Sequence, residues 1–159
     1  MKMSRVGLIV AMTLVAVSLG ASGSFSASER GTPAEAKAML KKAVKHYQTV
    51  GRDKALADFN NKQAPWVDRD LYIFCIDQKD IIIANSLLSE PVGKSLDLIK
   101  DSQEKPLGQA MWQAVAKNGS GSLHYRVPDP LSGKVQPKLS FLNKVGDDLC
   151  GVGIYMPES

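Results

Sequence analysis

The chain has 159 residues, and its 20 lysines and arginines exceed its 16 aspartates and glutamates, which gives a formal net charge of +4. The basic residues form no dense stripe and no nucleic-acid-binding motif, so we expect no nucleic-acid partner. Two cysteines and two distant histidines, His46 and His124, lack the spacing of a zinc site, and we expect neither a metal nor a cofactor.

The first 23 residues have the pattern of a secretory signal peptide. Lys2 and Arg5 precede a compact apolar run at residues 6–17, which is too short to span a bilayer as a helix, and small residues follow it. An uncleaved N-terminal anchor is the alternative. Removal of the signal leaves 18 basic against 16 acidic residues, a net charge of +2. We therefore expect a periplasmic or secreted protein with no membrane span in its mature chain, a linker at residues 24–32 and a single domain at residues 33–156.

Two helices are predicted at the start of this domain. Thr32 and Glu35 form a capping box around Pro33, a residue that is favoured at the first helical position. An apolar stripe at helical spacing continues until Gly51, and a shorter helix follows at residues 52–61. The residues expected on the buried sides of the two helices are Ala36, Met39, Leu40, Ala43, Val44, Tyr47, Leu56 and Phe59.

The remainder of the domain is predicted to contain five strands and two helices. A hairpin rich in β-branched and aromatic residues comes first, two helices follow, and three strands in a meander complete the chain. Residues 128–137 contain three prolines and are expected to be a polar connection rather than a strand. This order predicts an α+β domain with an antiparallel five-stranded sheet. The predicted strands are residues 69–77, 81–85, 121–127, 138–145 and 149–155, and the helices are residues 94–101 and 105–119.

The two cysteines, Cys75 and Cys150, lie in the first and the last of these strands. In an exported chain such a pair is most simply a disulfide, and a bridge requires Cα atoms within about 7 Å of each other. The two strands are therefore expected to be neighbours in the sheet. Alternation then places Leu71, Ile73, Cys75, Cys150, Val152 and Ile154 on one face, and Tyr72, Phe74, Gly151, Gly153 and Tyr155 on the other, where the glycines leave space for a ligand or for a closely packed helix.

The strand segments resemble those of the bacterial single Cache domain, type 2 form, which has a PAS-like fold. The matching segments are DLYIFCID, IIIAN followed by PVGKSL, GSGSLHYRV, PKLSFLNKV and LCGVGIY, and together they cover about residues 33–156. The resemblance implies a long N-terminal helix packed on one face of a five-stranded antiparallel sheet of order 2-1-5-4-3. It also implies a small-molecule pocket on the other face, and extracytoplasmic sensing of small organic ligands, often carboxylates. The sequence departs from the family pattern at Asn85, where histidine is common, and at Phe141, where tyrosine is common.

The candidate ligand site combines residue types that suit a carboxylate in a partly apolar pocket. Lys138 and Ser140 point away from Leu139 and Phe141 on the fourth strand, where a lysine can supply charge and a hydroxyl can orient a ligand. A solvated lysine is the alternative, and the lysine-x-serine pattern of the resembling family favours the site. For Tyr125 and Trp112, core packing is the alternative to a contact with ligand. The expected lining residues are Tyr72, Phe74, Trp112, Tyr125, Lys138 and Ser140.

These features predict a soluble periplasmic protein that binds a small organic acid and takes part in signal transduction. We do not expect an enzyme, because no nucleophile and base occur in a credible set. No cytoplasmic output module follows the last strand, so we expect the chain to pass its occupied state to a membrane sensor or transporter. The alternative is a structural or regulatory interaction protein with a vestigial pocket that binds a membrane sensor or another partner protein. A closed cavity with a polar floor beneath the third and fourth strands would favour the first reading.

Overall fold

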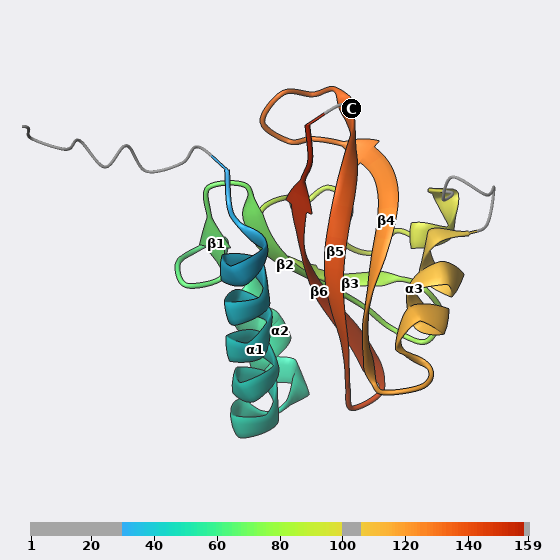
Figure 1. The fold of residues 1–159 in the computed structure, drawn as a ribbon. Helices are drawn as coiled ribbons and strands as arrows, with labels where there is room; N and C mark the ends of the chain where they lie inside the picture. The colour runs from blue at the N-terminus through green and yellow to red at the C-terminus, as the bar shows by residue number, and fades with distance from the viewer. Residues whose placement is uncertain (1–29, 100–105, 158–159) are drawn as a thin grey trace, which may run out of the picture.

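The computed structural model of the chain describes residues 30–99 and 106–157 (Figure 1). The predicted signal peptide, residues 1–23, lies outside the described residues, as does most of the predicted linker. Arg30 and Gly31, at the end of that linker, contact the folded domain, where the backbone N–H of Gly31 donates to Asp70 at 2.6 Å. Within the described part of the chain, no helix is both long enough and apolar enough to cross a membrane.

Helix α1, Pro33–Val50, begins with the predicted capping box. The Thr32 hydroxyl accepts a hydrogen bond from the backbone N–H of Glu35, and the Glu35 carboxylate accepts one from the backbone N–H of Thr32 at 2.7 Å. Gly51 ends the helix, and α2, Arg52–Asn60, follows at once. The predicted stripes of both helices face the sheet: Ala36, Met39, Leu40, Ala43, Tyr47, Leu56 and Phe59 are buried, and Val44 is half-buried.

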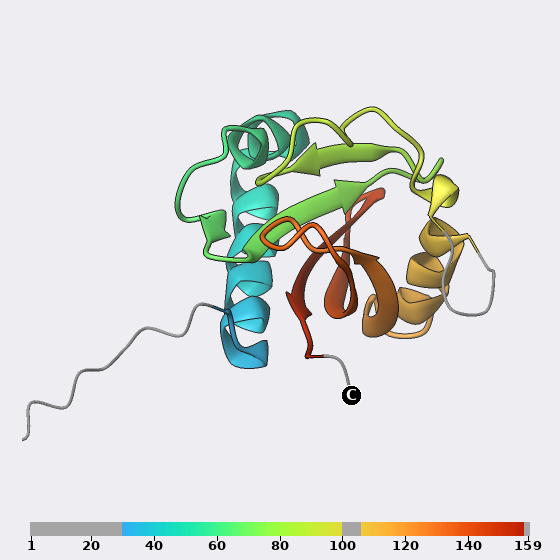
Figure 2. The same ribbon diagram turned by 90° about the horizontal axis from the view of Figure 1, so that it is seen from above.

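An antiparallel sheet forms the centre of the molecule (Figures 1 and 2). Its five longer strands lie in the order β3-β2-β6-β5-β4, which is the order 2-1-5-4-3 implied by the Cache resemblance. A two-residue strand, β1, also pairs with β2 and was not predicted. The bounds are Val67–Asp68 for β1, Leu71–Ile76 for β2, Ile82–Asn85 for β3, Ser120–Pro128 for β4, Val135–Val145 for β5 and Asp148–Tyr155 for β6.

The predicted polar connection at residues 128–137 is wrong at both ends, because Pro128 belongs to β4 and residues 135–137 belong to β5. Pro137 is tolerated inside a strand because its carbonyl faces the end of β6, where it accepts a hydrogen bond from the N–H of Met156 at 2.8 Å. A residue in an antiparallel strand directs its N–H and C=O to the same neighbour. The missing N–H of Pro137 therefore falls where β6 has already ended.

The two predicted helices in the middle of the chain are shorter than expected. The first is a single 3₁₀ turn, η1, Leu96–Leu98, and the second is α3, Leu107–Val115. Residues 100–105 lie outside the described part of the chain. Gly119 follows α3 with a φ of 68°, a left-handed conformation that favours glycine, and its N–H donates to the carbonyl of Val115 at 2.8 Å. The chain then turns directly into β4.

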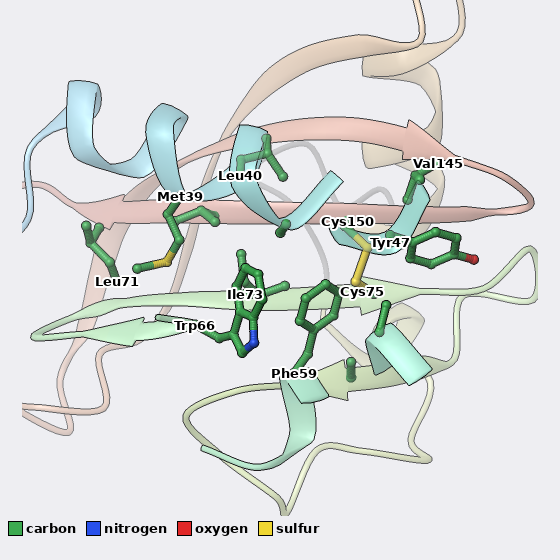
Figure 3. Packing of buried hydrophobic residues seen from close by; sticks show 14 of the residues in the cluster. Met39, Leu40, Tyr47, Phe59, Trp66, Leu71, Ile73, Cys75, Val145 and Cys150 are labelled. Carbon is green, nitrogen blue, oxygen red and sulfur yellow. A yellow bond between two sulfur atoms is a disulfide. The ribbon is translucent and has the colours of Figure 1, made fainter. Parts of the chain in front are cut away.

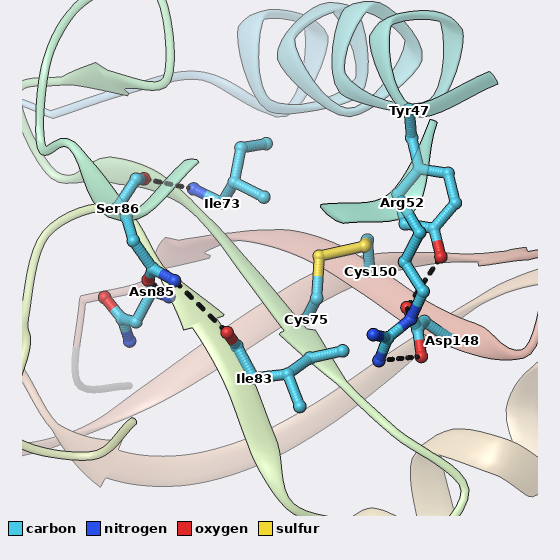
Figure 4. Close-up of a disulfide and its surroundings, with 10 residues drawn as sticks. Tyr47, Arg52, Ile73, Cys75, Ile83, Asn85, Ser86, Asp148 and Cys150 are labelled. Atoms are coloured by element: carbon cyan, nitrogen blue, oxygen red, sulfur yellow. Dashed lines mark hydrogen bonds and ion pairs between the residues drawn. A yellow bond between two sulfur atoms is a disulfide. The ribbon is translucent and has the colours of Figure 1, made fainter. Parts of the chain in front are cut away.

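The predicted disulfide joins Cys75 of β2 to Cys150 of β6, with the two Cα atoms 4.1 Å apart (Figure 4). The two cysteines are directly opposite each other in the antiparallel pairing of β2 with β6. Both the bond and the strand adjacency inferred from it are therefore confirmed. Because the neighbouring residues alternate between the two faces, this pairing also fixes which side chains of β2 and β6 lie together.

Each face of the sheet carries its own hydrophobic core. On the first face, α1 and α2 cover the disulfide, and the rings of Phe59 and Trp66 pack edge to face with centroids 4.9 Å apart (Figure 3). On the second face, α3 and η1 cover the other set of strand residues. The predicted faces are confirmed: Leu71, Ile73, Cys75, Cys150, Val152 and Ile154 lie in the first core, and Tyr72, Phe74 and Tyr155 lie in the second.

Asp148 is buried at the start of β6. Its carboxylate accepts hydrogen bonds from the Tyr47 hydroxyl at 2.7 Å and from Nε of Arg52 at 2.8 Å (Figure 4). Burial and the bond to this carboxylate raise the pKa of the Tyr47 hydroxyl. The contact fastens the C-terminal end of α1 and the start of α2 to the sheet.

Candidate ligand-binding site

A cavity of about 300 Å³ lies on the second face of the sheet, opposite α1. The sheet supplies one side of the cavity, and η1, α3 and the segment after β3 supply the other. Most of its wall is apolar, and its polar side chains come from all five longer strands and from the segment after β3. The lining residues are Tyr72, Phe74, Ile82, Asn85, Leu88, Glu90, Pro91, Leu96, Ile99, Leu107, Met111, Tyr125, Val127, Pro128, Lys138 and Tyr155.

Lys138 supplies a cation to this cavity, and only 1% of the residue is exposed. Its ammonium donates to the Tyr72 hydroxyl at 2.7 Å and to the Tyr155 hydroxyl at 3.4 Å. The ammonium also lies 4.2 Å and 4.6 Å from the centroids of the same two rings, within cation–π range. Within residues 30–99 and 106–157, no ion pair joins Lys138 to a carboxylate.

The lysine keeps its charge in this setting. Burial by itself lowers the pKa of the Lys138 ammonium, but attraction to the surrounding tyrosine hydroxyls outweighs that effect and holds the pKa above its ordinary value. Burial likewise opposes ionisation of Tyr72, yet the adjacent ammonium lowers the pKa of that hydroxyl. The cavity thus holds a positive charge that its described neighbours solvate but do not neutralise.

Tyr125 and Ser140 form a hydrogen-bonded pair on the neighbouring strands β4 and β5. Their hydroxyl oxygens are 2.8 Å apart, and both residues are buried. Tyr125 lines the cavity, whereas Ser140 lies behind the wall and is not among the lining residues. Burial raises the pKa of the Tyr125 hydroxyl. Ser140 is thus placed to orient Tyr125 rather than to contact a ligand.

Trp112 is not part of the cavity. It lies on α3, half-buried, and packs against the second core. Four of the six predicted residues line the cavity, namely Tyr72, Phe74, Tyr125 and Lys138. Strand alternation placed Tyr72 with Phe74 and Lys138 with Ser140, but it did not show that the two pairs share a face, and it could not tell which residues of a helix would turn toward the sheet.

Tyr155 and Asn85 were missing from the predicted lining. Tyr155 shares the face of Tyr72, so strand alternation was a sufficient signal, and its hydroxyl donates to the carbonyl of Pro128 at 3.2 Å. The side-chain oxygen of Asn85 accepts from the backbone N–H groups of Leu87 and Leu88 at 3.1 Å and 2.8 Å. These hydrogen bonds hold Asn85 in the cavity wall, at the position where the family that the sequence resembles commonly has histidine.

The two glycines of β6 make room for the site's own side chains, not for a ligand or for α1. A Cβ atom on Gly153 would lie 2.4 Å from Cε of Lys138 and 2.4 Å from Oγ of Ser140. A Cβ atom on Gly151 would lie 2.5 Å from Cζ of Phe74. Since real Cβ contacts are essentially never this short, Gly153 is what allows the lysine stem to cross β6, and Gly151 makes room for the ring of Phe74.

Comparison with known proteins places this geometry in a family. A family model described as "Single Cache domain 2" matches residues 20–157. The chain belongs to this family. The periplasmic sensor domain of a chemotaxis protein is 24% identical and superposes with a TM-score of 0.64, covering 78% of this chain and 94% of that one. No curated protein matches the chain.

Two further solved structures share this Cache fold. A methyl-accepting chemotaxis protein from Vibrio parahaemolyticus is 21% identical with a TM-score of 0.61, over 77% of this chain and 86% of that one. A structure described as the basis for carboxylic acid recognition by a Cache chemosensory domain is 18% identical with a TM-score of 0.58, over 76% and 86%. At these identities the likeness shows the fold, which is the predicted α+β, PAS-like Cache architecture.

The Tyr125–Ser140 pair allows a test of how the cavity wall is built. Replacing Ser140 with alanine should lower the free energy of unfolding by about 1–3 kcal/mol, because the buried Tyr125 hydroxyl loses its partner. Adding Tyr125→Phe should recover much of that loss, since both polar groups are then gone. Urea unfolding of the two single variants and the double variant measures the coupling. Strictly additive losses would show that the two hydroxyls do not depend on each other.

Proposed function

We propose that the protein is an extracytoplasmic sensory domain that binds a small organic acid, with the carboxylate on Lys138. The main support is the charged ammonium of Lys138. The residue is 1% exposed, it lies on the floor of the cavity, and it has no carboxylate partner among the described residues. A buried charge is costly unless it is paired, so an anion that enters the cavity gains more there than at an exposed lysine. The hydroxyls of Tyr72 and Tyr125 can donate to the same carboxylate.

The remaining lining residues favour an acid with one carboxylate and an apolar remainder. Among the lining residues that the structure describes, Lys138 is the sole cation, and Ile82, Leu107 and Met111 belong to the apolar wall. The carboxylate of Glu90, which also lines the cavity, accepts a hydrogen bond from the ammonium of Lys94 at 2.6 Å. A second carboxylate on the ligand would be buried against carbon or placed near Glu90, and both positions cost free energy.

The setting of the domain supports a role in sensing. The family match joins it to sensory domains, and one of the similar structures is a periplasmic sensor domain. Together with the predicted signal peptide, this favours a periplasmic or secreted location. In that location the occupied domain would act through a membrane sensor or transporter.

A calorimetric titration with matched ligands tests the proposal. We expect saturable binding by at least one short monocarboxylate in a panel from acetate to benzoate. The corresponding amides, which have the same shape without the charge, should not bind. The pKa of Lys138 is held above its ordinary value, so affinity should be constant near neutral pH and fall only as the ligand carboxylate protonates, at about pH 4–5.

Native mass spectrometry of the freshly purified protein is the complementary measurement, because it detects a retained small molecule of unknown identity. Equal affinity for acid and amide would contradict the role of Lys138. A protein that binds no member of the panel and retains no molecule would favour the alternative, an interaction protein with a vestigial pocket.

A further inference from the structure

A second hollow, separate from the ligand cavity, lies on the first face of the sheet beside α1. It is an open groove of about 490 Å³ with α1 as one wall and the neighbouring parts of β4 and β5 as its floor. We call it the α1–β4 groove. Its lining residues are Lys37, Leu40, Lys41, Val44, Ser120, Gly121, Ser122, Phe141, Leu142 and Asn143.

The groove exists because the helices on this face do not extend over β4, the strand at the edge of the sheet. Contacts on this face run from α2 to β3 and from α1 to β2, β5 and β6. Figure 1 shows β4 at the far side of the sheet from α1. Because neighbouring strands are about 4.8 Å apart, the strip left uncovered is about one strand wide, and it adjoins the groove wall formed by α1. The outward row of β4 is accordingly exposed: Ser120, Ser122, His124, Arg126 and Pro128.

The chemistry of the groove is apolar at its floor and basic along its wall. Phe141 is half-buried on β5, and the ammonium of Lys37 lies 4.8 Å from the centroid of its ring. Lys41 is one turn further along α1 and is exposed. Within the part of the chain that the structure describes, neither lysine has an ion pair, and no acidic residue lines the groove.

We propose that the α1–β4 groove docks an amphipathic helix of a partner protein, with a narrow apolar stripe bordered by acidic residues. The apolar stripe would cover Val44 and Phe141, and the acidic residues would pair with Lys37 and Lys41. This surface lies on the opposite face of the sheet from the ligand cavity. The inference therefore goes beyond the proposed ligand binding and does not depend on it.

A second copy of this chain does not match the groove. The exposed side of α1 is basic, and α3 carries no acidic residue. The acidic residues of α1 and α2 are already paired with basic neighbours, Glu35 with Arg69, Asp53 with Arg52, and Asp58 with Lys54 and His46. Charge complementarity therefore favours a different protein as the partner.

The test uses a defined helical probe and a site-specific reporter. The probe is a stapled peptide of about 18 residues with a leucine stripe bordered by glutamates, since stapling holds the peptide in its helical form before it binds. Both native cysteines are in the disulfide, so a cysteine introduced by Ser122→Cys can be labelled selectively with an environment-sensitive dye. A label at Thr49→Cys, an exposed position outside the groove lining, is the matched control.

We expect the peptide to change the fluorescence of the Ser122→Cys label but not that of the control label. The combined change Lys37→Glu and Lys41→Glu should weaken binding about tenfold, as loss and reversal of two exposed ion pairs imply. A peptide with glutamine in place of glutamate should bind correspondingly less well. The control variant combines Lys42→Glu and Lys79→Glu, which changes the net charge by the same amount at exposed positions outside the groove. It should leave binding nearly unchanged.

Three results would overturn the proposal. The first is equal loss of binding in the groove variant and the control variant, which would indicate a non-specific charge effect. The second is self-association of the protein that the groove variant abolishes, measured by sedimentation. The third is groove-dependent binding to phosphatidylglycerol vesicles without binding of the acidic peptide, which would make the surface a membrane contact.

Discussion

Replacing Lys138 with methionine is expected to weaken carboxylate binding about 100-fold while leaving the protein as stable as before, or more stable. The loss of affinity follows from removal of the charge on which the proposed carboxylate rests, because a hydrogen bond to a charged group contributes about 1.5–3 kcal/mol. Methionine keeps an unbranched stem of similar length, so it can follow the same path past Gly153.

The expected gain in stability has a separate cause. Burying the Lys138 charge costs free energy in the unliganded protein. In the described structure this cost is offset by tyrosine hydroxyls and rings rather than by a carboxylate. Removal of the charge removes that cost. The Tyr72 hydroxyl still has the Tyr155 hydroxyl 3.3 Å away, so it is not left without a partner.

Two measurements separate these effects: calorimetric titration with the best ligand from the panel, and urea unfolding of the unliganded protein. Lys134→Met is the matched control, since Lys134 is exposed in the loop between β4 and β5 and does not line the cavity. It should change neither quantity. A Lys138→Met variant that is strongly destabilised would show that the lysine has a structural role, and one that binds the ligand normally would remove Lys138 from the site.

Lys138 also shows why strand alternation alone left its role open. Alternation separated Lys138 from Leu139 and Phe141 without deciding between a solvated lysine and a site residue. In the structure, Lys138, Ser140 and Leu142 are more deeply buried than Leu139 and Phe141. Alternation assigns faces but does not say what covers them. The cover on the second face is α3 and η1, which pack there through long-range contacts that no local pattern encodes.

The adjacency of the first and last predicted strands could be predicted because the disulfide is a constraint between distant parts of the chain, whereas the full strand order was implied by the family resemblance. Cys75 and Cys150 had to be close, which placed the first and last predicted strands side by side, and the family resemblance supplied the same order. The strand boundaries near Pro128 and Pro137 could not be predicted in the same way. Proline is penalised in a strand only when its missing N–H faces a partner, and that depends on where the neighbouring strand ends.

The apolar wall of the cavity was also beyond prediction. Leu107 and Met111 of α3, together with Leu96 of η1, occupy regular helical positions that look like ordinary core residues. They are core residues, and the cavity is the space that their packing leaves above Lys138. A volume of this kind depends on distances between elements, whereas a sequence pattern reports only which side of an element is apolar.

Removing the disulfide is expected to have the opposite effect to removing Lys138: a large loss of stability with little change in ligand affinity. The bond closes a loop with a sequence separation of 75 residues, for which the loop-entropy model gives about 4 kcal/mol. The sulfurs lie in the first core, beneath α1, whereas Tyr72 and Tyr155 reach the cavity from the second face. Backbone pairing of β2 with β6 on both sides of the bond should preserve the positions of those tyrosines once the chain is folded.

The measurement compares two proteins, each with and without reductant. One is the wild type, and the other is a double variant that carries both Cys75→Ala and Cys150→Ala. Urea unfolding should show the double variant less stable by several kcal/mol and insensitive to reductant, while the wild type loses a similar amount once it is reduced. Ligand titration under conditions where both proteins are folded should give similar affinities. A double variant that is as stable as the oxidised wild type would contradict the bond. One that folds but no longer binds would show that the bond positions the site across the sheet, and that the two faces are coupled.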